Sequence, residues 1–311
     1  MISIIVNSWK EPNSIGKVIN NIANKEFSGL SQDFELIQVS PDNETLTAGK
    51  VAAEKLNLGN RYIQVKDPQK GKPFALKMAL KKAKGDILLL TDGEVFFGEM
   101  ATKKLLYPLL SNPKIGGATG RPISVSDRNT FMGYISHILT DSAHHRRTHT
   151  MNKNGDYYIS GKTFFPMSGY MIAMRNVISI PDDVLSDDGY MSYELRNKGY
   201  EIAYVPDAYV YVKFPDNLKD YFKQKVRSLG GYIQLHKYNI MKKDKQSRSF
   251  PIELGYAWFV LTYPKNFKEF IWSILFFPVR LYTWVLIFYQ RVILKKGMPK
   301  KGWERIESTK Y

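Results

Sequence analysis

Short apolar runs alternate with amphipathic stretches along the first two hundred residues. The apolar runs have the length of buried strands, which are predicted over residues 3–6, 34–39, 61–65 and 87–90. The amphipathic segments predict helices over residues 12–24, 44–57 and 73–84, the last closed by Gly85 as a C-cap. This alternation predicts an α/β fold with a mostly parallel sheet that is covered by helices on both faces.

After residue 115 the alternation becomes less regular. Further strands are predicted over residues 118–125, 168–174, 202–205 and 209–212. Further helices are predicted over residues 131–147, 184–198 (closed by Gly199) and 216–238 (with Asn217 as a possible N-cap). From residue 250 onward aromatic and apolar residues dominate. We therefore expect an α/β domain over residues 1–215 and a helical region over residues 216–311.

Two acidic residues, Asp92 and Glu94, follow the predicted strand 87–90 directly. In open α/β sheets ligands bind at the carboxyl ends of the strands. Two carboxylates at that place suit a hard divalent cation, Mg²⁺ or Mn²⁺, that also carries phosphate oxygens. An acidic surface turn explains this segment alone equally well.

The composition excludes some chemistry. The chain has 311 residues and no cysteine, so disulfides, thiolate metal sites and cysteine nucleophiles are excluded. The apolar N-terminus, residues 1–6, is too short for a secretory signal and is predicted to be a first core strand. We therefore expect the α/β domain to be cytosolic.

The net charge of +16 is unevenly distributed, because residues 216–311 hold 19 Lys and Arg but only 7 Asp and Glu. Such a basic region implies an anionic partner, either lipid or nucleic acid. Aromatic residues in nucleic-acid grooves usually alternate with Lys and Arg, whereas here they form long apolar runs. We expect an anionic membrane surface and no nucleic acid.

Six motifs in order along the chain resemble those of one enzyme family. They are Val-Asn-Ser-Trp-Lys-Glu at 6–11, the strand 35–42 ending in Pro-Asp, Gly-Lys at 71–72 with Ala-Leu-Lys at 75–77, Asp-Gly-Glu at 92–94, Ser-Asp-Asp at 186–188, and Gln-Lys-Val-Arg-Ser at 224–228. The chain resembles the inverting glycosyltransferases of family 2, which have the nucleotide-sugar-binding GT-A fold, over about residues 2–235. Each motif is weak alone, whereas the ordered set is specific.

The resemblance implies a role for each matching residue. The catalytic domain would bind a UDP- or GDP-sugar donor through Asn7, Ser8, Trp9, Glu11, Asp42, Lys72, Asp92 and Gly93. Asp92 and Glu94 would hold Mn²⁺ or Mg²⁺, and Asp188 would be the general base. The acceptor or pyrophosphate side would be formed by Ser168, Gly169, Asp187, Gln224 and Arg227.

Each of these roles has a structural alternative. Asp188 belongs to an acidic cluster with Asp182, Asp183 and Asp187 that would also complement a helix dipole. Asp42 is equally compatible with a turn, and Ser168–Gly169 with a closely packed strand start. Two positions depart from the family pattern, with Lys77 in place of Asn and Ser228 in place of Trp. The missing Trp argues against a processive polysaccharide synthase.

The histidine-rich segment 144–149 raises the question of a metal site. Adjacent histidines on a helix point in different directions, and no acidic residue stands beside them in the sequence. An exposed basic helix near anionic headgroups is therefore the favoured interpretation.

The apolar and aromatic stretch at residues 270–294 is long enough for a membrane span, which needs about 20 apolar residues. However, Arg280 near its middle would cost about 2.5–3.5 kcal/mol. A single crossing would also export the lysines at 295, 296, 300 and 301, against the positive-inside rule. Two shorter interfacial helices, bent at Pro278, avoid both problems. We expect a monotopic protein on the cytoplasmic membrane face. A single membrane span and an apolar oligomer interface are the two alternatives.

The predicted function is transfer of a sugar from a nucleotide-diphosphate donor to a membrane-borne acceptor, either lipid-linked or a glycolipid. The rival functions are a processive polysaccharide synthase, a non-catalytic lipid-binding protein and a nucleic-acid-binding protein.

Overall fold

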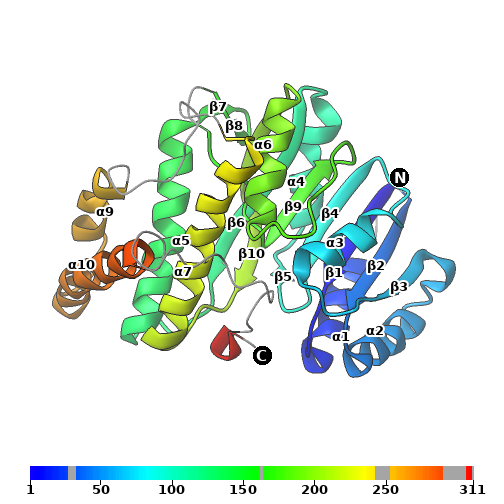
Figure 1. The fold of residues 1–311 in the computed structure, drawn as a ribbon, viewed down its shortest axis with the longest axis horizontal. Coiled ribbons are helices and arrows are strands. Elements are labelled where there is room, and N and C mark those ends of the chain that lie inside the picture. The colour runs from blue at the N-terminus through cyan, green and yellow to red at the C-terminus, as the bar shows by residue number, and fades with distance from the viewer. Residues whose placement is uncertain (27–32, 162–163, 242–252, 290–305, 310–311) are drawn as a thin grey trace.

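A computed structural model describes residues 1–26, 33–161, 164–241, 253–289 and 306–309 (Figure 1). The first half of the α/β part has alternating elements: β1 Ile2–Asn7, α1 Pro12–Asn20, the π-helical turn Asn21–Glu26, β2 Phe34–Ser40, α2 Asn43–Lys55, the 3-10 turn Gly59–Arg61, β3 Tyr62–Lys66, α3 Lys72–Leu80, β4 Ile87–Asp92, β5 Phe96–Phe97 and α4 Ala101–Ser111. This half confirms the predicted alternation.

The second half has longer helices and shorter edge strands: β6 Ile115–Ser124, α5 Phe131–Thr150, β7 Asn152–Asn154, β8 Tyr157–Ile159, β9 Met171–Arg175, α6 Asp187–Asn197, β10 Glu201–Val212, α7 Leu218–Gln234 and the 3-10 turn Leu235–Tyr238. In the described part of the remaining chain lie α9 Ala257–Thr262, α10 Phe267–Phe288 and the 3-10 turn Glu307–Thr309. Helices α9 and α10 lie beside α5 and α7, at the opposite side of the molecule from β1–β3 (Figure 1).

One sheet in the order β3-β2-β1-β4-β9-β6-β10-β8-β7 carries the α/β part, with β5 paired to β10. Strands β1–β4 are parallel to one another, and β9 runs antiparallel to both β4 and β6. Side chains that alternate along β1 enter two cores, with Ile4 facing α1 and Ile5 facing α3. Helices therefore cover both faces, as predicted.

The parallel register fixes where the ligand edge of the sheet lies. Asn7, the last residue of β1, is paired in register with Asp92, the last residue of β4. The sheet therefore ends in polar side chains that come from segments far apart in the sequence.

Several sequence predictions need correction. Helix α3 ends at Leu80, and Gly85 is not its C-cap: the Gly85 backbone N–H donates to Ser3 Oγ at 2.8 Å, and a Cβ there would lie 2.5 Å from the Ser3 nitrogen. The two strands predicted over residues 202–212 are one strand, β10, which keeps its pairing with β6 through a register irregularity between Tyr204 and Tyr209. Gly199 (φ +88°) and Asn217, which accepts from the Asp220 backbone N–H, confirm the predicted helix end and N-cap.

The prediction of two helices bent at Pro278 is also wrong, because α10 is continuous from Phe267 to Phe288. The helix is held on both sides of the proline. Glu269 is bonded to Arg128 before it, and Arg280 contacts Glu253 and the Tyr221 hydroxyl after it. Residues 290–294 and the lysines at 295, 296, 300 and 301 lie outside the described residues.

Candidate active site

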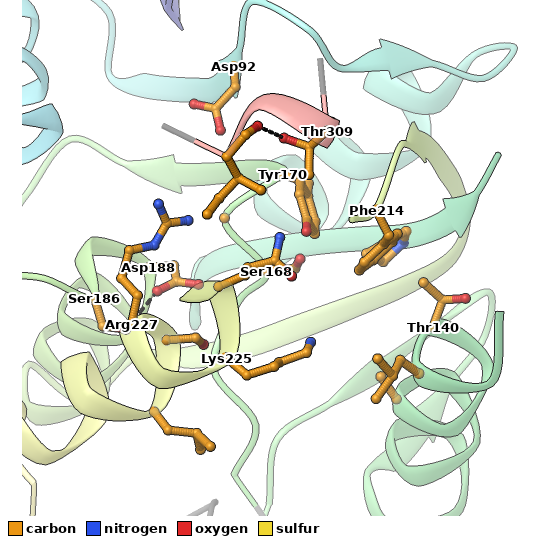
Figure 2. Close-up of a pocket in the computed structure, with 18 of the residues that line it drawn as sticks. Asp92, Thr140, Ser168, Tyr170, Ser186, Asp188, Phe214, Lys225, Arg227 and Thr309 are labelled. Atoms are coloured by element: carbon orange, nitrogen blue, oxygen red, sulfur yellow. Dashed lines mark hydrogen bonds between the residues drawn. The ribbon is translucent and has the colours of Figure 1, made fainter. Parts of the chain in front are cut away.

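A cavity of about 1340 Å³ opens at the carboxyl edge of the sheet. Its walls come from the ends of β1 and β4, the start of α3, the turn before β9, the start of α6, and the inner faces of α5, α7, α9 and α10. Figure 2 shows Asp92, Tyr170, Ser168, Asp188, Arg227 and Lys225 around one part of it. The cavity runs from the sheet to the C-terminal helices.

Most residues that sequence analysis singled out line this cavity. They are Asn7, Ser8, Trp9, Glu11, Lys72, Asp92, Glu94, Ser168, Gly169, Asp187, Asp188, Gln224 and Arg227. The structure therefore brings together segments that stand more than two hundred residues apart, from Asn7 to Arg227, whereas the role of each residue stays a prediction.

Asp92 is held by Lys72, the first residue of α3. The Lys72 ammonium lies 2.7 Å from Asp92 Oδ1 and 2.9 Å from Oδ2. Burial opposes a charged ammonium, but the neighbouring carboxylates of Asp92, Asp187 and Asp188 outweigh it and raise the pKa of Lys72 above its ordinary value. Lys72 therefore stays a cation amid several acids.

The acidic cluster before α6 divides into two pairs. Asp182 forms an ion pair with Lys77 at 2.7 Å, and Asp183 accepts from the Tyr238 hydroxyl at 2.6 Å. Asp187 and Asp188 instead line the cavity. Asp182 and Asp183 thus have structural partners outside α6, whereas Asp187 and Asp188 face the cavity, so the cluster does not act through the helix dipole alone.

Asp188 is oriented by the turn that begins α6. Its Oδ1 accepts from the Ser186 hydroxyl at 2.8 Å and from the Gly189 backbone N–H at 2.7 Å. A Cβ on Gly169 would lie 3.4 Å from Asp188 Oδ2, so the Ser168–Gly169 turn packs against this carboxylate. Burial raises the pKa of the adjacent Asp187, against the opposing charge of Lys72.

Arg227 and Tyr170 complete the wall between the acids (Figure 2). Burial lowers the pKa of the Arg227 guanidinium, against the opposing influence of Tyr170 and Asp92. Burial also raises the pKa of Tyr170 to about 12, so its hydroxyl is protonated near neutral pH. Sequence analysis missed Tyr170, although it directly follows the Ser168–Gly169 pair.

Polar groups at the end of β1 are positioned for a ligand. Asn7 Oδ1 and Trp9 Nε1 are buried atoms without a hydrogen-bond partner among the described residues, and both residues line the cavity. Buried polar atoms are normally paired, so these two point to a ligand that pairs them. Gly93 packs closely against this segment, because a Cβ there would lie 2.5 Å from Glu11 Oε2 and 2.8 Å from Ser8 Cβ.

Two of the singled-out residues, Asp42 and Gly93, are not among those that line the cavity. Asp42 is the N-cap of α2, where its carboxylate accepts from the backbone N–H groups of Thr45 at 2.8 Å and Lys10 at 2.7 Å. Burial raises the pKa of Asp42, but these hydrogen bonds lower it by more. The structural alternative accounts for Asp42 here, and its contact with the donor stays a prediction.

The expectation of an exposed basic helix at residues 144–149 is wrong in part. Arg147 is buried and its Nη2 donates to the Pro166 carbonyl at 3.2 Å, and His144 Nδ1 lies 2.8 Å from the Tyr204 hydroxyl. Arg146 and Arg147 line the cavity instead of facing outward. Ile306 and Thr309, near the C-terminus, also line it, and sequence analysis gave no signal for them.

Comparison with known proteins decides the family. A family profile described as "Glycosyltransferase like family 2" matches residues 1–231. The chain belongs to this family. Poly-beta-1,6-N-acetyl-D-glucosamine synthase of Staphylococcus epidermidis is 24% identical over 234 residues, which are 74% of this chain and 54% of that protein. The synthase of the same name from Staphylococcus aureus strain MSSA476 is 23% identical over the same shares. The chain thus spans about half the length of these curated relatives.

Solved structures confirm the GT-A fold for this family 2 chain. A mannosyltransferase of Pyrobaculum calidifontis, in complex with GDP-Man and Mn²⁺, has a TM-score of 0.56 at 17% identity over 96% of this chain and 76% of that one. Staphylococcus aureus TarS has a TM-score of 0.53 at 17% identity over 85% of this chain and 49% of that one. These structures confirm the predicted fold. The predicted nucleotide-sugar transferase class is confirmed by the family match.

Proposed function

We propose that this protein is an inverting glycosyltransferase that moves a sugar from a UDP- or GDP-linked donor to a membrane-borne acceptor. The observation that carries the proposal is one cavity lined by Asp92 at the end of β4 and by Asp188 at the start of α6, with Lys72 near both. A leaving-group site and a base are the two groups that sugar transfer from a nucleotide requires. Two structures of similar fold, the Pyrobaculum mannosyltransferase and a TarS fragment, hold GDP-Man and UDP-GlcNAc respectively, which supports a nucleotide-sugar donor.

The donor end fits a divalent cation. Asp92 and Glu94 offer carboxylate oxygens to one cavity, and Mg²⁺ commonly takes one or two carboxylates together with substrate phosphates. Mn²⁺ or Mg²⁺ bound there would offset the negative charge that develops on the departing nucleoside diphosphate. Lys72 and Arg227 add two fixed positive groups to the same wall, so the chain itself stabilises that charge.

Asp188 is the proposed base. An acceptor hydroxyl oxygen forms a bond to the anomeric carbon, while the bond from that carbon to the β-phosphate oxygen breaks and its electron pair leaves with the nucleoside diphosphate. The hydroxyl proton passes to a carboxylate oxygen of Asp188. Ser186 and Gly189 both donate to Oδ1, so they fix the orientation of the carboxylate. Such general-base help is typically worth about 10²–10⁴ in rate.

Helix α10 supports the membrane part of the proposal. Among the described residues it is the one helix long and apolar enough to cross a membrane. Its inner face is docked on the protein through Glu269, Ser273 and Thr283, which are all buried. Its outer face consists of exposed apolar residues: Phe267, Phe270, Ile271, Ile274, Leu275, Leu281, Tyr282, Val285 and Phe288. Because one face of α10 is docked on the protein and the other is apolar, the helix is better suited to lie in the plane of the cytoplasmic membrane surface than to cross the membrane.

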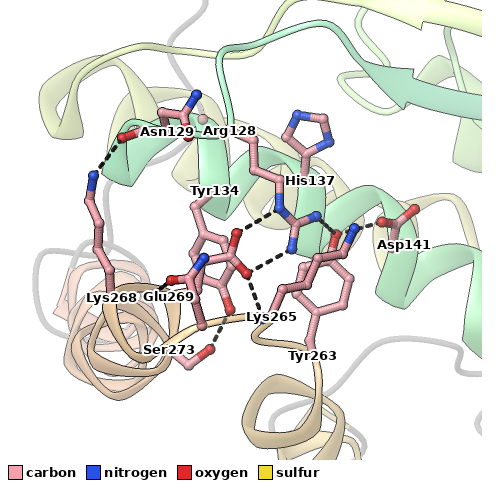
Figure 3. A network of polar contacts seen from close by, with 12 residues as sticks. Arg128, Asn129, Tyr134, His137, Asp141, Tyr263, Lys265, Lys268, Glu269 and Ser273 are labelled. Atoms are coloured by element: carbon pink, nitrogen blue, oxygen red, sulfur yellow. Dashed lines mark hydrogen bonds and ion pairs between the residues drawn. The ribbon is translucent and has the colours of Figure 1, made fainter.

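The docked face is held by a polar network (Figure 3). The Arg128 guanidinium donates to both Glu269 carboxylate oxygens, at 2.8 and 2.9 Å, and to the Tyr263 hydroxyl at 2.8 Å. The Tyr263 hydroxyl in turn donates to Asp141 Oδ2 at 2.6 Å, and Tyr134 Oη lies 2.6 Å from Ser273 Oγ. Six side chains from two helices, α5 and α10, and from the loops that hold Arg128 and Tyr263 thus fix the direction that the outer face presents.

The curated relatives favour a second candidate, a polysaccharide synthase that adds many sugars without release. Product length separates the two functions. A transferase that releases its product gives an acceptor extended by one residue under excess donor. A ladder of products that persists under excess acceptor would favour the synthase.

A donor screen tests the main proposal. Thermal unfolding is measured with UDP- and GDP-sugars, with and without Mn²⁺. We expect a Mn²⁺-dependent rise of the melting temperature for one nucleotide, which Asp92→Ala removes. Sedimentation with vesicles containing anionic lipid tests the membrane part, and Ile274→Glu on the outer face of α10 should reduce binding. If no nucleotide sugar changed the melting temperature, the donor assignment would be overturned. If Ile274→Glu and the unmodified protein sedimented equally with the vesicles, the membrane assignment would be overturned.

A further inference from the structure

Asp67 is a buried carboxylate to which neither the sequence analysis nor the proposed reaction gives a role. It directly follows β3, is 6% exposed and lines the cavity. Its carboxylate accepts from the backbone N–H groups of Gln69, at 3.1 Å to Oδ1, and of Lys70. Burial raises the pKa of Asp67, because it outweighs these two hydrogen bonds. A carboxylate has about four acceptor sites, so Asp67 can also accept from a ligand.

Asp67 stands at one end of a row of strand ends, and Asp92 stands at the other. The parallel strands β4, β1, β2 and β3 are neighbours in this order (Figure 1). The register pairs Asn7 with both Asp92 and Val39. The Asp67 backbone N–H donates to the Ser40 carbonyl at 3.0 Å, which ties the end of β3 to that of β2. Since neighbouring strands are about 4.8 Å apart, the row spans about 14 Å, comparable to the length of an extended nucleoside diphosphate.

The turn between β3 and α3 holds Asp67 in place. Gln69 has a left-handed φ of +59°, a conformation that a residue with a side chain keeps only where its surroundings fix it. The Lys70 ammonium lies over the Phe74 ring, 5.1 Å from its centroid. Because the row of strand ends leads from Asp92 to this turn, a nucleotide with its pyrophosphate at Asp92 would have its base beside Asp67.

We infer that Asp67 recognises the nucleobase of the donor by accepting the ring N–H of uracil (N3–H) or guanine (N1–H), and that the site rejects cytosine and adenine. At the equivalent ring position cytosine and adenine present a lone pair, which a carboxylate repels because it is an acceptor only. This inference rests on the proposed function. It assigns the base contact to Asp67 in place of Asp42, which is the N-cap of α2 and is not among the residues that line the cavity.

Trp9 supports the same choice of bases. Its indole N–H is a buried donor on the same cavity and has no hydrogen-bond partner among the described residues. Uracil and guanine both carry a carbonyl oxygen beside the ring N–H, and this oxygen is an acceptor that such a donor requires. Cytosine and adenine carry an amino group there, which is a donor.

Binding of nucleoside diphosphates tests the inference without turnover. UDP, CDP, GDP and ADP are titrated calorimetrically into the full-length protein with Mn²⁺ present. We expect UDP or GDP to bind, and its counterpart without the ring N–H (CDP for UDP, ADP for GDP) to bind at least about tenfold more weakly. Equal binding of the counterpart would overturn the inference and leave the proposed function standing. If none of the four bound, the proposed function would fail, and the inference would fail with it.

Variants assign the preference to a residue. Asp67→Asn keeps an oxygen for the Gln69 N–H and offers an acceptor and a donor that can exchange places, so it fits either kind of base edge. We expect the preference to fall below about threefold, mainly because the counterpart binds more tightly. Asp67→Ser, whose hydroxyl can hold the same turn, should give the same result. Asp156→Asn, at an exposed position between β7 and β8, should keep the preference.

Two results would overturn the role of Asp67. If Asp67→Asn weakened both nucleotides equally and kept their ratio, Asp67 would only support the turn. If Asp42→Asn removed the preference while Asp67→Asn retained it, the base contact would belong to Asp42.

Discussion

The two ends of the cavity are built in different ways. The end that we propose for the donor, here called the donor end, is made by strand ends and helix starts whose positions follow from the sheet register, as the pairing of Asn7 with Asp92 shows. The end that we propose for the acceptor, here called the acceptor end, is made by α5, α7, α9 and α10, which are joined by side chains distant in the sequence, such as Arg128 and Glu269. Chemistry at the donor end is thus a property of the sheet edge, while chemistry at the acceptor end depends on how the helices dock.

The largest expected effect comes from Asp188, where the two ends meet. Asp188→Asn keeps the size of the side chain but removes the proton acceptor, so we expect kcat to fall by about 10²–10⁴ while nucleotide affinity stays within twofold. Steady-state kinetics and nucleotide titration measure the two quantities. Asp183→Asn is the matched control, because Asp183 belongs to the same acidic cluster but is bonded to Tyr238. Retained turnover in Asp188→Asn would remove this residue from the base role.

Docking of the acceptor end is tested at Arg128. Its partner Glu269 is buried, with a side chain only 7% exposed, so Arg128→Met leaves a carboxylate without its main counter-charge. We expect the free energy of unfolding in urea to fall by about 2–4 kcal/mol, since removing one partner of a buried pair is strongly destabilising. Lys50→Met, at an exposed pair with Glu54, should cost less than about 1 kcal/mol. Equal losses would show that α10 is not held by this network.

The donor end is tested at Lys72, which occupies both oxygens of Asp92. A divalent cation bound to Asp92 must compete with this ammonium, so Lys72→Met should tighten Mn²⁺ binding about tenfold, or roughly 1.4 kcal/mol. Calorimetric titration of Mn²⁺ measures the change. Lys77→Met is the control, since Lys77 is paired with Asp182 and is not among the residues that line the cavity. Weaker Mn²⁺ binding in Lys72→Met would mean that Lys72 supports the metal rather than competing with it.

This contrast between the ends also explains what could be predicted from the sequence. The strands β1–β4 were predictable because each is a short, largely apolar run that precedes a turn or helix, and Asp92 is the last residue of β4. Asp187 and Asp188 carry a local signal too, an acidic pair at a helix start. The very short strands β5, β7 and β8 hold two or three residues each, too few to show a periodicity.

The rest of the site was not predictable, because it depends on contacts between distant segments. Thr309 lines the cavity from the 3-10 turn near the C-terminus. This turn is anchored by a hydrogen bond that Ser308 Oγ donates to Asp220 Oδ2 at 2.5 Å, and the two residues are 88 positions apart in the chain. Arg146 has the sequence context of a surface helix, yet it lines the cavity and lies over the rings of Phe165 and Tyr256, which are distant from it in the sequence. The continuous course of α10 through Pro278 likewise follows from docking on both sides of the proline.

The smallest expected effect concerns acid stability at the acceptor end, where His144 of α5 meets Tyr204 of β10 at 2.8 Å. Burial, and next the charge of Arg121, lowers the pKa of His144 from its ordinary value of 6.5 to about 4. Between these two pH values the imidazole of the unfolded chain binds a proton that the native imidazole does not. The contribution of His144 to the free energy of unfolding therefore rises with pH across this window and is lost as the pH falls through it.

Because His144 is only half-buried, we expect this group to account for about 1 kcal/mol of the loss between pH 6.5 and pH 4, below the full value of its shift. Urea unfolding at both pH values measures it. His144→Gln should lower stability at pH 7 by about 1 kcal/mol through its hydrogen bond to Tyr204, yet show a flatter pH profile than the unmodified protein. His236→Gln, at an exposed position, should keep the original profile. If the free energy of unfolding of the unmodified protein and of His144→Gln depended on pH in the same way, the native imidazole would be protonated as easily as the unfolded one. Water would then reach the contact between α5 and β10, and the acceptor end would be less tightly packed than the donor end.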